Sequence, residues 1–308
     1  MPLPAGASVG VALFPDHAST AEELMKKSDI AMYEAKHGGR KMACVFDAPM
    51  QAKINDARLL ELEMQLAIEQ EQFEPWFQPI ENIVTGQVTS YEALARWLHP
   101  QRGIIQPNRF IPIAEHTGMI LAIGEQILEK ACRAAKNWEP HLTVAVNPSP
   151  VQFRRPQLLV DTVKRVLERA QLEPSRLYLE ITETLMMEDT TQTRLAIEEL
   201  ALLGVRFSLD DFGAGYSSLS YIQSYPFKKK IDKKFIDRID SDKTSSAIVA
   251  AIGVLASRID LEIVAEGVET QLQHATLREL GLTLAQGFLY GRPSPRVVSA
   301  PRLRAAGM

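Results

Sequence analysis

Short apolar runs with a carboxylate or carboxamide at or near their ends recur along the second part of this chain. A continuous apolar run is typical of a parallel strand that is buried on both faces, and a polar residue at its carboxyl end then lies at the edge of the sheet. The runs are VTSYE with Glu92, TVAVN with Asn147, LYLEIT with Glu180, VRFSLDD with Asp210 and Asp211, and LEIVAE with Glu266.

Segments with helical periodicity separate these runs. From Pro75 onward, the pattern predicts strands that alternate with helices, which favours an α/β fold with a mostly parallel sheet. The expected helices lie near 108–122, 124–138, 150–171, 190–203, 243–259 and 269–280. The 308 residues accommodate one (β/α)8 barrel of about 250 residues and an appendage. In such a barrel the active site lies at the carboxyl ends of the strands, so the polar residues should converge there.

The first part of the chain has a different organisation. Two apolar strands, SVGVALF and KMACVF, flank a helix over residues 21–39, and a charged helix follows from about Met50 to Phe73. Its residues Leu59, Leu62, Leu66 and Phe73 fall on one side, which we expect to pack against a neighbouring domain. The first strand–helix–strand segment is too short to bury an independent core. The predicted divisions are 1–48, a linker helix over 49–74, and a barrel over 75–308.

Composition narrows the range of functions. The net charge of −4 argues against long nucleic acid as a binding partner. Cys44 and Cys132 lack the spacing of a zinc site or redox motif. The most apolar stretch, 247–265, contains Arg258, Asp260 and Glu262 and does not resemble a membrane span, and the start does not resemble a signal peptide. We therefore expect a cytoplasmic protein.

The converging acids point to a metal site. Any one carboxylate is more often a helix cap or a solvated strand end, but these acids and an amide at one rim form an oxygen-rich pocket that suits Mg2+ or Mn2+. Asp210 and Asp211 are adjacent, and consecutive strand residues point to opposite faces. Both can reach one site only where the strand ends and turns, and the glycines at 213 and 215 permit such a turn.

An ordered set of motifs carries a family resemblance. The blocks are FQPI (77–80), EALARW (92–97), VNPS (146–149), LEITE (179–183), DDFGAGYSSL (210–219), KIDKKFI (230–236), AEGVET (265–270) and AQGF (285–288). In this order, and over roughly residues 75–295, they resemble the EAL family of cyclic di-GMP phosphodiesterases. Residues 6–46 resemble the C-terminal end of a GGDEF diguanylate cyclase domain. The GGDEF motif itself is absent from the chain, so no cyclase activity is expected.

The resemblance implies a modified TIM barrel that hydrolyses cyclic di-GMP to linear pGpG with two Mg2+ or Mn2+ ions. By the same resemblance, Glu92, Asn147, Glu180 and Asp210 hold the first ion, Asp210 bridges to the second, and Asp211 is a further ligand. The resemblance also places Lys230 near the reacting water or the leaving oxygen, in a proton-handling or electrostatic role, and implies that Glu266 positions or deprotonates the metal-bound water.

The resemblance also assigns residues around the metal centre. Arg96 contacts a phosphate oxygen, and Gln78 and Gln286 read guanine edges. Glu183 tethers the loop 210–218, which contributes to the family's dimer interface, so a homodimer through the barrel is implied.

Three departures from the family pattern bear on activity. Ala214 replaces a common threonine, and Lys233-Lys234 stands where Arg-Ser is common. The segment YPFKKKID is one residue shorter than the familiar PFxxLKID, and a slip of one residue reverses the facing of a strand. We expect the approach to the strand to absorb the deletion, which leaves Lys230 pointing inward near Asp210 and Asp211.

Two alternatives remain open. A catalytically weak or silent cyclic di-GMP receptor is favoured only by the shortened segment. A TIM-barrel metalloenzyme with another substrate would leave Gln78, Arg96 and Gln286 unexplained.

Overall fold

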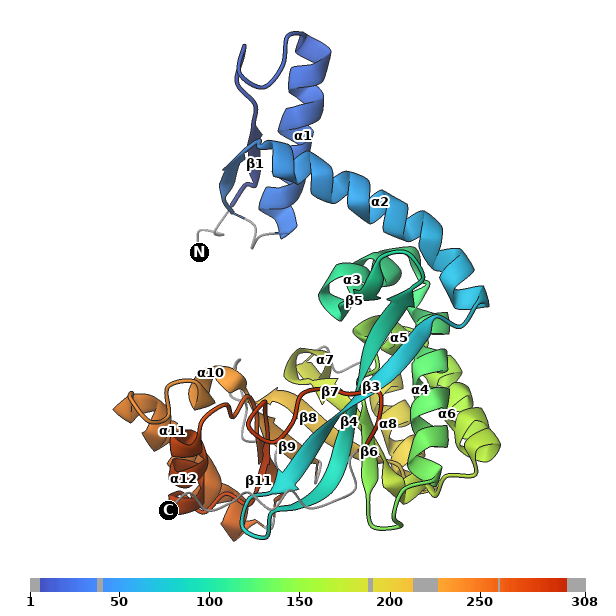
Figure 1. Cartoon of the computed structure of the whole chain (residues 1–308), viewed down its shortest axis with the longest axis vertical. Coiled ribbons are helices and arrows are strands. Elements are labelled where there is room, and N and C mark those ends of the chain that lie inside the picture. The colour runs from blue at the N-terminus through green and yellow to red at the C-terminus, as the bar shows by residue number, and fades with distance from the viewer. Residues whose placement is uncertain (1–5, 38–40, 188–190, 213–226, 260, 298–308) are drawn as a thin grey trace. The chain divides into compact units, whose positions relative to one another are not determined.

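The protein forms two compact units, which comprise Met1–Leu66 and Ala67–Met308. The computed structural model describes residues 6–37, 41–187, 191–212, 227–259 and 261–297 (Figure 1). Among these residues, no helix is long and apolar enough to cross a membrane.

The first unit is a small α/β assembly. Strands β1 (Val9–Val11) and β2 (Ala43–Val45) pair in parallel, and helix α1 (Ala21–His37) connects them. A small core gathers Ile30, Ala31 and Phe46. Gly10 allows β1 to approach α1, because a Cβ at this position would lie 2.0 Å from the Ser28 carbonyl oxygen. The strand–helix–strand pattern expected from the sequence is therefore present.

Helix α2 (Ala48–Glu69) does not bury the predicted stripe. Leu59, Leu62 and Leu66 are 49%, 75% and 53% exposed, whereas Leu60 and Met64 are fully buried. Helix α2 therefore carries two apolar stripes at helical spacing, between which periodicity alone does not choose, and packing of the predicted stripe against a neighbouring domain stays a prediction. Phe73, which was assigned to the same stripe, lies instead in the first barrel strand.

The second unit is a closed barrel of eight strands, which confirms the predicted fold class. The ring runs β3-β11-β10-β9-β8-β7-β6-β4 and closes through the pairing of β4 with β3, while β5 extends the sheet from β4. The strands are β3 (Phe73–Asn82), β4 (Gln87–His99), β5 (Gly103–Ile105), β6 (Thr143–Val146), β7 (Leu177–Thr182), β8 (Arg206–Phe212), β9 (Lys228–Ile231), β10 (Ile263–Ala265) and β11 (Leu284–Gln286).

The barrel departs from strict βα alternation at its first step. Strands β3 and β4 form a long antiparallel hairpin, and β3 is also antiparallel to β11. The turn is built by Asn82, whose side-chain oxygen accepts hydrogen bonds from the backbone N–H groups of Val84 and Thr85, both at 3.0 Å. Gly86 completes the turn with a φ of 71°. The alternation expected from Pro75 onward therefore begins only after this hairpin.

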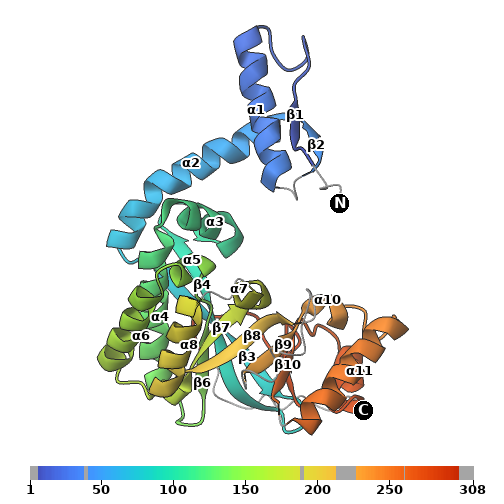
Figure 2. The ribbon, with the colours of Figure 1, turned by 180° about the vertical axis from the view of Figure 1, so that it is seen from behind.

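Helices follow the later strands near the expected positions, and α4, α6 and α8 lie side by side outside the sheet (Figures 1 and 2). They are α3 (Pro107–Thr117), α4 (Ile120–Lys136), α5 (Pro150–Phe153), α6 (Pro156–Ala170), α7 (Glu183–Met187), α8 (Thr191–Leu203), α10 (Lys233–Ile236), α11 (Lys243–Arg258) and α12 (Gln271–Glu279), with a short 3-10 turn at Pro174–Arg176. The single helix expected over 150–171 is two helices, because Pro156 begins a second one.

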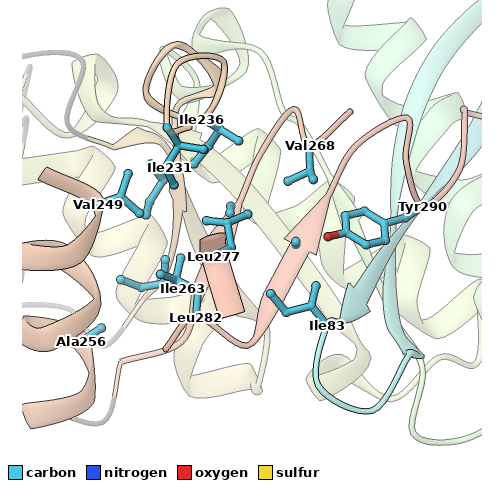
Figure 3. Packing of buried hydrophobic residues seen from close by; sticks show 13 residues of the cluster. Ile83, Ile231, Ile236, Val249, Ala256, Ile263, Val268, Leu277, Leu282 and Tyr290 are labelled. Carbon is cyan, nitrogen blue, oxygen red and sulfur yellow. The ribbon is translucent and has the colours of Figure 1, made fainter. Parts of the chain in front are cut away.

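Apolar packing fixes the strands of the second half. Ile231 of β9 and Ile263 of β10 belong to a cluster with Val249 of α11 and Leu277 of α12 (Figure 3). This packing holds β9 in register with β10, where Lys230 is opposite Val264. Alternation along β9 then places Lys228 and Lys230 on one face and Lys229 on the other.

Lys229 lies in an apolar environment. The residue is 1% exposed, and its ammonium lies 5.3 Å from the centroid of the Phe227 ring. Within the described residues, the structure gives this ammonium no hydrogen bond or ion pair. Burial lowers the pKa of Lys229 to about 8. The residue occupies the position where the familiar motif has leucine.

We expect Lys229→Leu to stabilise the protein at pH 7 by about 1–3 kcal/mol, since it removes a buried ammonium that has no hydrogen-bond partner among the described residues. The pKa of Lys229 is lower in the folded protein than in the unfolded chain. The charged ammonium therefore destabilises the fold below about pH 8, and the free energy of unfolding increases as the pH rises from there towards the pKa of lysine in the unfolded chain. Thermal unfolding from pH 6.5 to 10 measures both effects. Equal melting temperatures for Lys229→Leu and the parent at pH 7 would contradict the apolar environment, and Lys243→Leu on the exposed end of α11 is the control.

Candidate functional site

Polar side chains from all sides of the barrel meet at the carboxyl end of its parallel strands. Gln78 on β3 pairs directly with Glu92 on β4, so the antiparallel strand also contributes to this site. Asn147 follows β6, Glu180 lies on β7, and Asp210 lies on β8. The remaining members are Lys230 on β9, Glu266 directly after β10, and Gln286 at the end of β11.

Lys230 points into the barrel and is the centre of this group. Its ammonium lies 3.0 Å from Glu92 Oε2, 2.8 Å from Glu180 Oε2 and 2.6 Å from Glu266 Oε1. The side chain is 1% exposed. The shortened segment before β9 has therefore not turned Lys230 outward. Asp210 lies close enough to raise the pKa of Lys230, but the three glutamates are its ion-pair partners.

Amide side chains hold Glu92 in place from both sides. Asn147 Nδ2 donates to Glu92 Oε1 at 2.7 Å, and Gln286 Nε2 donates to Glu92 Oε2 at 2.6 Å. Gln286 Nε2 also contacts Gln78 Oε1 at 3.2 Å, and Gln78 donates to the Gly291 carbonyl at 3.1 Å. These bonds connect β3, β4, β6 and β11 across the barrel mouth.

Several carboxyl groups of the site surround one ammonium. Burial raises the pKa of Glu92, but Lys230 and the hydrogen bonds from Gln286 and Asn147 outweigh it and leave the value lowered. Burial and the nearby Glu92 raise the pKa of Glu180 well above its usual range, with Lys230 in opposition. Burial raises the pKa of Glu266 to about 7. The raised pKa values of Glu180 and Glu266 mean that Lys230 alone does not fully stabilise their charged forms, and a further cation in the pocket would favour those forms.

Two cavities open beside this group. One of about 370 Å³ is lined by Glu92, Asn147, Glu180 and Asp210, together with apolar side chains of α3 and α4. The other, of about 270 Å³, is lined by Gln78, Glu266 and Gln286 and includes Phe288. Glu92, Leu94 and Asp210 line both, so the cavities adjoin at the acids.

The donor set fits Mg2+ or Mn2+. Glu92, Asn147, Glu180 and Asp210 line one cavity, and their oxygens are the hard ligands that these ions prefer. In the described part of the chain, however, no three acidic, histidine or cysteine side chains are already gathered into a metal-binding group. Glu92 and Glu180 are instead directed at the Lys230 ammonium, which is the cation that lies between them.

Two predicted roles involve parts of the chain outside the described structure. The side chain of Asp211 is not described, and neither are residues 213–218 of the loop assigned to Glu183. Glu183 itself begins α7 and is 8% exposed. The role of Glu183 as a tether and the role of Asp211 as a metal ligand stay predictions.

Arg96 lies farther along β4 than Glu92 and is 7% exposed. Its guanidinium carbon lies 5.6 Å from the Trp76 ring centroid. The sequence reasoning missed Trp76, although it directly precedes the FQPI block. It also missed Phe288, which lines the second cavity and stacks with Arg292 at 4.1 Å, although Phe288 ends the AQGF block.

The chain matches two family models. Residues 61–293 match the EAL domain, and residues 2–42 match the diguanylate cyclase GGDEF domain.

Similar proteins agree with this assignment. The bifunctional diguanylate cyclase/cyclic di-GMP phosphodiesterase MucR of Pseudomonas aeruginosa is 43% identical over 294 residues, which cover 94% of this chain and 43% of MucR. The chain thus spans less than half the length of this relative. A solved structure of the MucR phosphodiesterase in complex with c-di-GMP superposes with a TM-score of 0.73 at 43% identity, covering 77% of this chain and 98% of that structure.

A more distant structure has the same fold. The calcium and cy-diGMP complex of BlrP1 from Klebsiella pneumoniae has a TM-score of 0.65 at 30% identity, and the match covers 73% of this chain and 57% of BlrP1. The predicted family is confirmed: this chain belongs to the EAL domain family and carries a fragment of a GGDEF domain at its N-terminal end.

Proposed function

We propose that this chain hydrolyses cyclic di-GMP to linear pGpG with two Mg2+ or Mn2+ ions. The observation that carries the proposal is the convergence of Glu92, Asn147, Glu180 and Asp210 on one cavity, with Lys230 at their centre. An acidic pocket would repel a phosphodiester unless cations neutralise it, so this donor set suits metal-assisted hydrolysis. The similarity to MucR supplies the substrate class.

Each residue has a proposed task. Glu92, Asn147, Glu180 and Asp210 would hold one ion, and Asp210 with Asp211 would hold the other. When bound, such ions lower the pKa of a coordinated water and neutralise charge on the phosphate oxygens. The water oxygen forms a bond to phosphorus, and the bond from phosphorus to the 3′ oxygen breaks. Glu266 Oε1 accepts the water proton, and Lys230 Nζ protonates the leaving oxygen.

The surrounding residues bind the substrate. Gln78 and Gln286 lie at the second cavity, where their amides can pair with guanine edges. Arg96 supplies a guanidinium for a phosphate oxygen. We also propose that the chain acts in the cytoplasm as a homodimer through its barrel.

The receptor alternative loses its main support. It rested on the possibility that the short segment before β9 turns Lys230 away, whereas Lys230 contacts Glu92, Glu180 and Glu266 inside the barrel.

The direct test is to incubate the purified chain with cyclic di-GMP and Mn2+ or Mg2+ and to resolve the products by chromatography. We expect pGpG to accumulate. Tight binding without product would favour the receptor, and neither binding nor product would favour a metalloenzyme with another substrate.

We expect Glu92→Gln to reduce turnover more than a hundredfold, because it removes a proposed ligand and also the charge that faces Lys230. Substrate binding should survive in part, since Arg96 and the two glutamines remain. The rate of product release in saturating Mn2+ measures the effect. Glu279→Gln, at an exposed position on α12, is the matched control and should keep the parental rate. Near-parental turnover by Glu92→Gln would rule out the proposed first metal site.

We expect Ca2+ to fail as a substitute for Mg2+ in turnover. Ca2+ is larger, takes about six to eight oxygen ligands, and is less suited to a compact octahedral site. Initial rates with each ion at matched concentrations measure this, and a binding assay with Ca2+ should still detect cyclic di-GMP. Similar rates with both ions would count against a tight two-metal site.

A further inference from the structure

Arg96 is buried in an unusual state for a charged side chain. It is 7% exposed, and Nη1 donates to the Ala95 carbonyl at 2.8 Å. Its buried Nε has no hydrogen-bond partner among the described residues. An unpaired donor on a buried cation is costly, so it points to an acceptor that arrives with a ligand.

Trp76 lies on the same face of the hairpin as Arg96. In the pairing of β3 with β4, Trp76 is opposite Leu94 and Glu74 is opposite Arg96, so Trp76 and Arg96 are diagonal neighbours. The same alternation places Gln78 and Glu92 on this face. The indole therefore contacts the guanidinium, with Cζ 5.6 Å from the ring centroid, on the side that faces the site.

The acid nearest to Arg96 in register is engaged elsewhere. Glu74 Oε1 lies 2.7 Å from Lys130 Nζ on α4, and Lys130 also donates to the backbone carbonyls of Glu71 and Phe73. A carboxylate on Arg96 would occupy the donors that a phosphate needs. The indole face attracts the cation without using any N–H group, so Trp76 can hold the guanidinium while its donors stay available.

We propose that Trp76 is a positioning residue that orients Arg96 for a phosphodiester oxygen of the substrate, while Lys130 keeps Glu74 away from Arg96. This inference rests on the proposed function, because the anion it assigns to Arg96 is the phosphodiester of a cyclic dinucleotide. Trp76 acts through Arg96 and takes no part in bond breaking.

A double-mutant cycle tests the coupling. Trp76→Leu should raise the KM for cyclic di-GMP about 2- to 30-fold, the range that a cation–π contact supports, with a smaller change in kcat. Trp76→Phe should recover most of this loss, because it keeps an aromatic face. In an Arg96→Ala background, Trp76→Leu should have no further effect. Multiplicative losses in the double variant, or a parental KM in Trp76→Leu, would overturn the proposal.

A second variant tests the role of Lys130. Lys130→Met should release Glu74 to pair with Arg96 and raise KM, and adding Glu74→Gln should restore it. If Glu74→Gln gives no recovery, Lys130 does not act through Glu74, and that part of the proposal fails.

A spectroscopic readout separates this inference from the proposed function. The chain has three tryptophans, so 5-fluorotryptophan labelling gives three fluorine resonances, and Trp76→Phe identifies one. That resonance should shift in ligand-free Arg96→Ala, and no shift would refute the contact. If the parent releases no pGpG while the shift is seen, the proposed function fails and the Trp76–Arg96 contact stands.

Discussion

The ammonium of Lys230 holds the mouth of the barrel together. It binds Glu92 on β4, Glu180 on β7 and Glu266 after β10, which lie at separate positions around the ring. Without a cation among them, these carboxylates would repel one another at low dielectric, and burying them unpaired would be costly. Asn147 and Gln286 extend the arrangement through Glu92. If the proposed first ion is held by Glu92 and Glu180, these two carboxylates would exchange the ammonium for the ion, and metal loading would be linked to the position of Lys230.

Much of this site could be predicted from local patterns. Apolar runs mark the strands, and their terminal polar residues mark the rim because parallel strands end together. The contacts across the barrel could not be predicted in the same way. Asp210 and Asp211 are close to Lys230 in the motif order, whereas Glu92 is 138 residues away in sequence and yet contacts it. Such contacts depend on closure of the ring, which periodicity does not report.

Where the structure differs from what the sequence pattern predicts, the cause is also a contact that the pattern does not contain. The β3–β4 hairpin depends on one side-chain-capped turn at Asn82, and its strands are longer than a buried parallel strand requires. On α2, two apolar stripes compete, and only tertiary packing selects Leu60 and Met64 over Leu59 and Leu62. The run Lys228-Lys229-Lys230 shows the limit most clearly. Lys228 pairs with Glu262, Lys230 pairs with three glutamates, and Lys229 lies over Phe227. The sequence alone does not distinguish these three consecutive lysines.

Because β3 is antiparallel to β4, the turn between these two strands lies away from the site and can be modified. Because β4 runs parallel to β6, its carboxyl end lies at the site, and the turn that joins it to β3 lies at the opposite end of the barrel. The turn residues Val84, Thr85 and Gly86 are all exposed. A Cβ added to Gly86 would meet no other atom within 4 Å. A group attached to the exposed side chain of Val84 adds no residue to the loop, so it leaves the pairing of Gln78 with Glu92 unchanged. This turn is therefore a natural place to attach a reporter group or a tether without touching the chemistry at the other end.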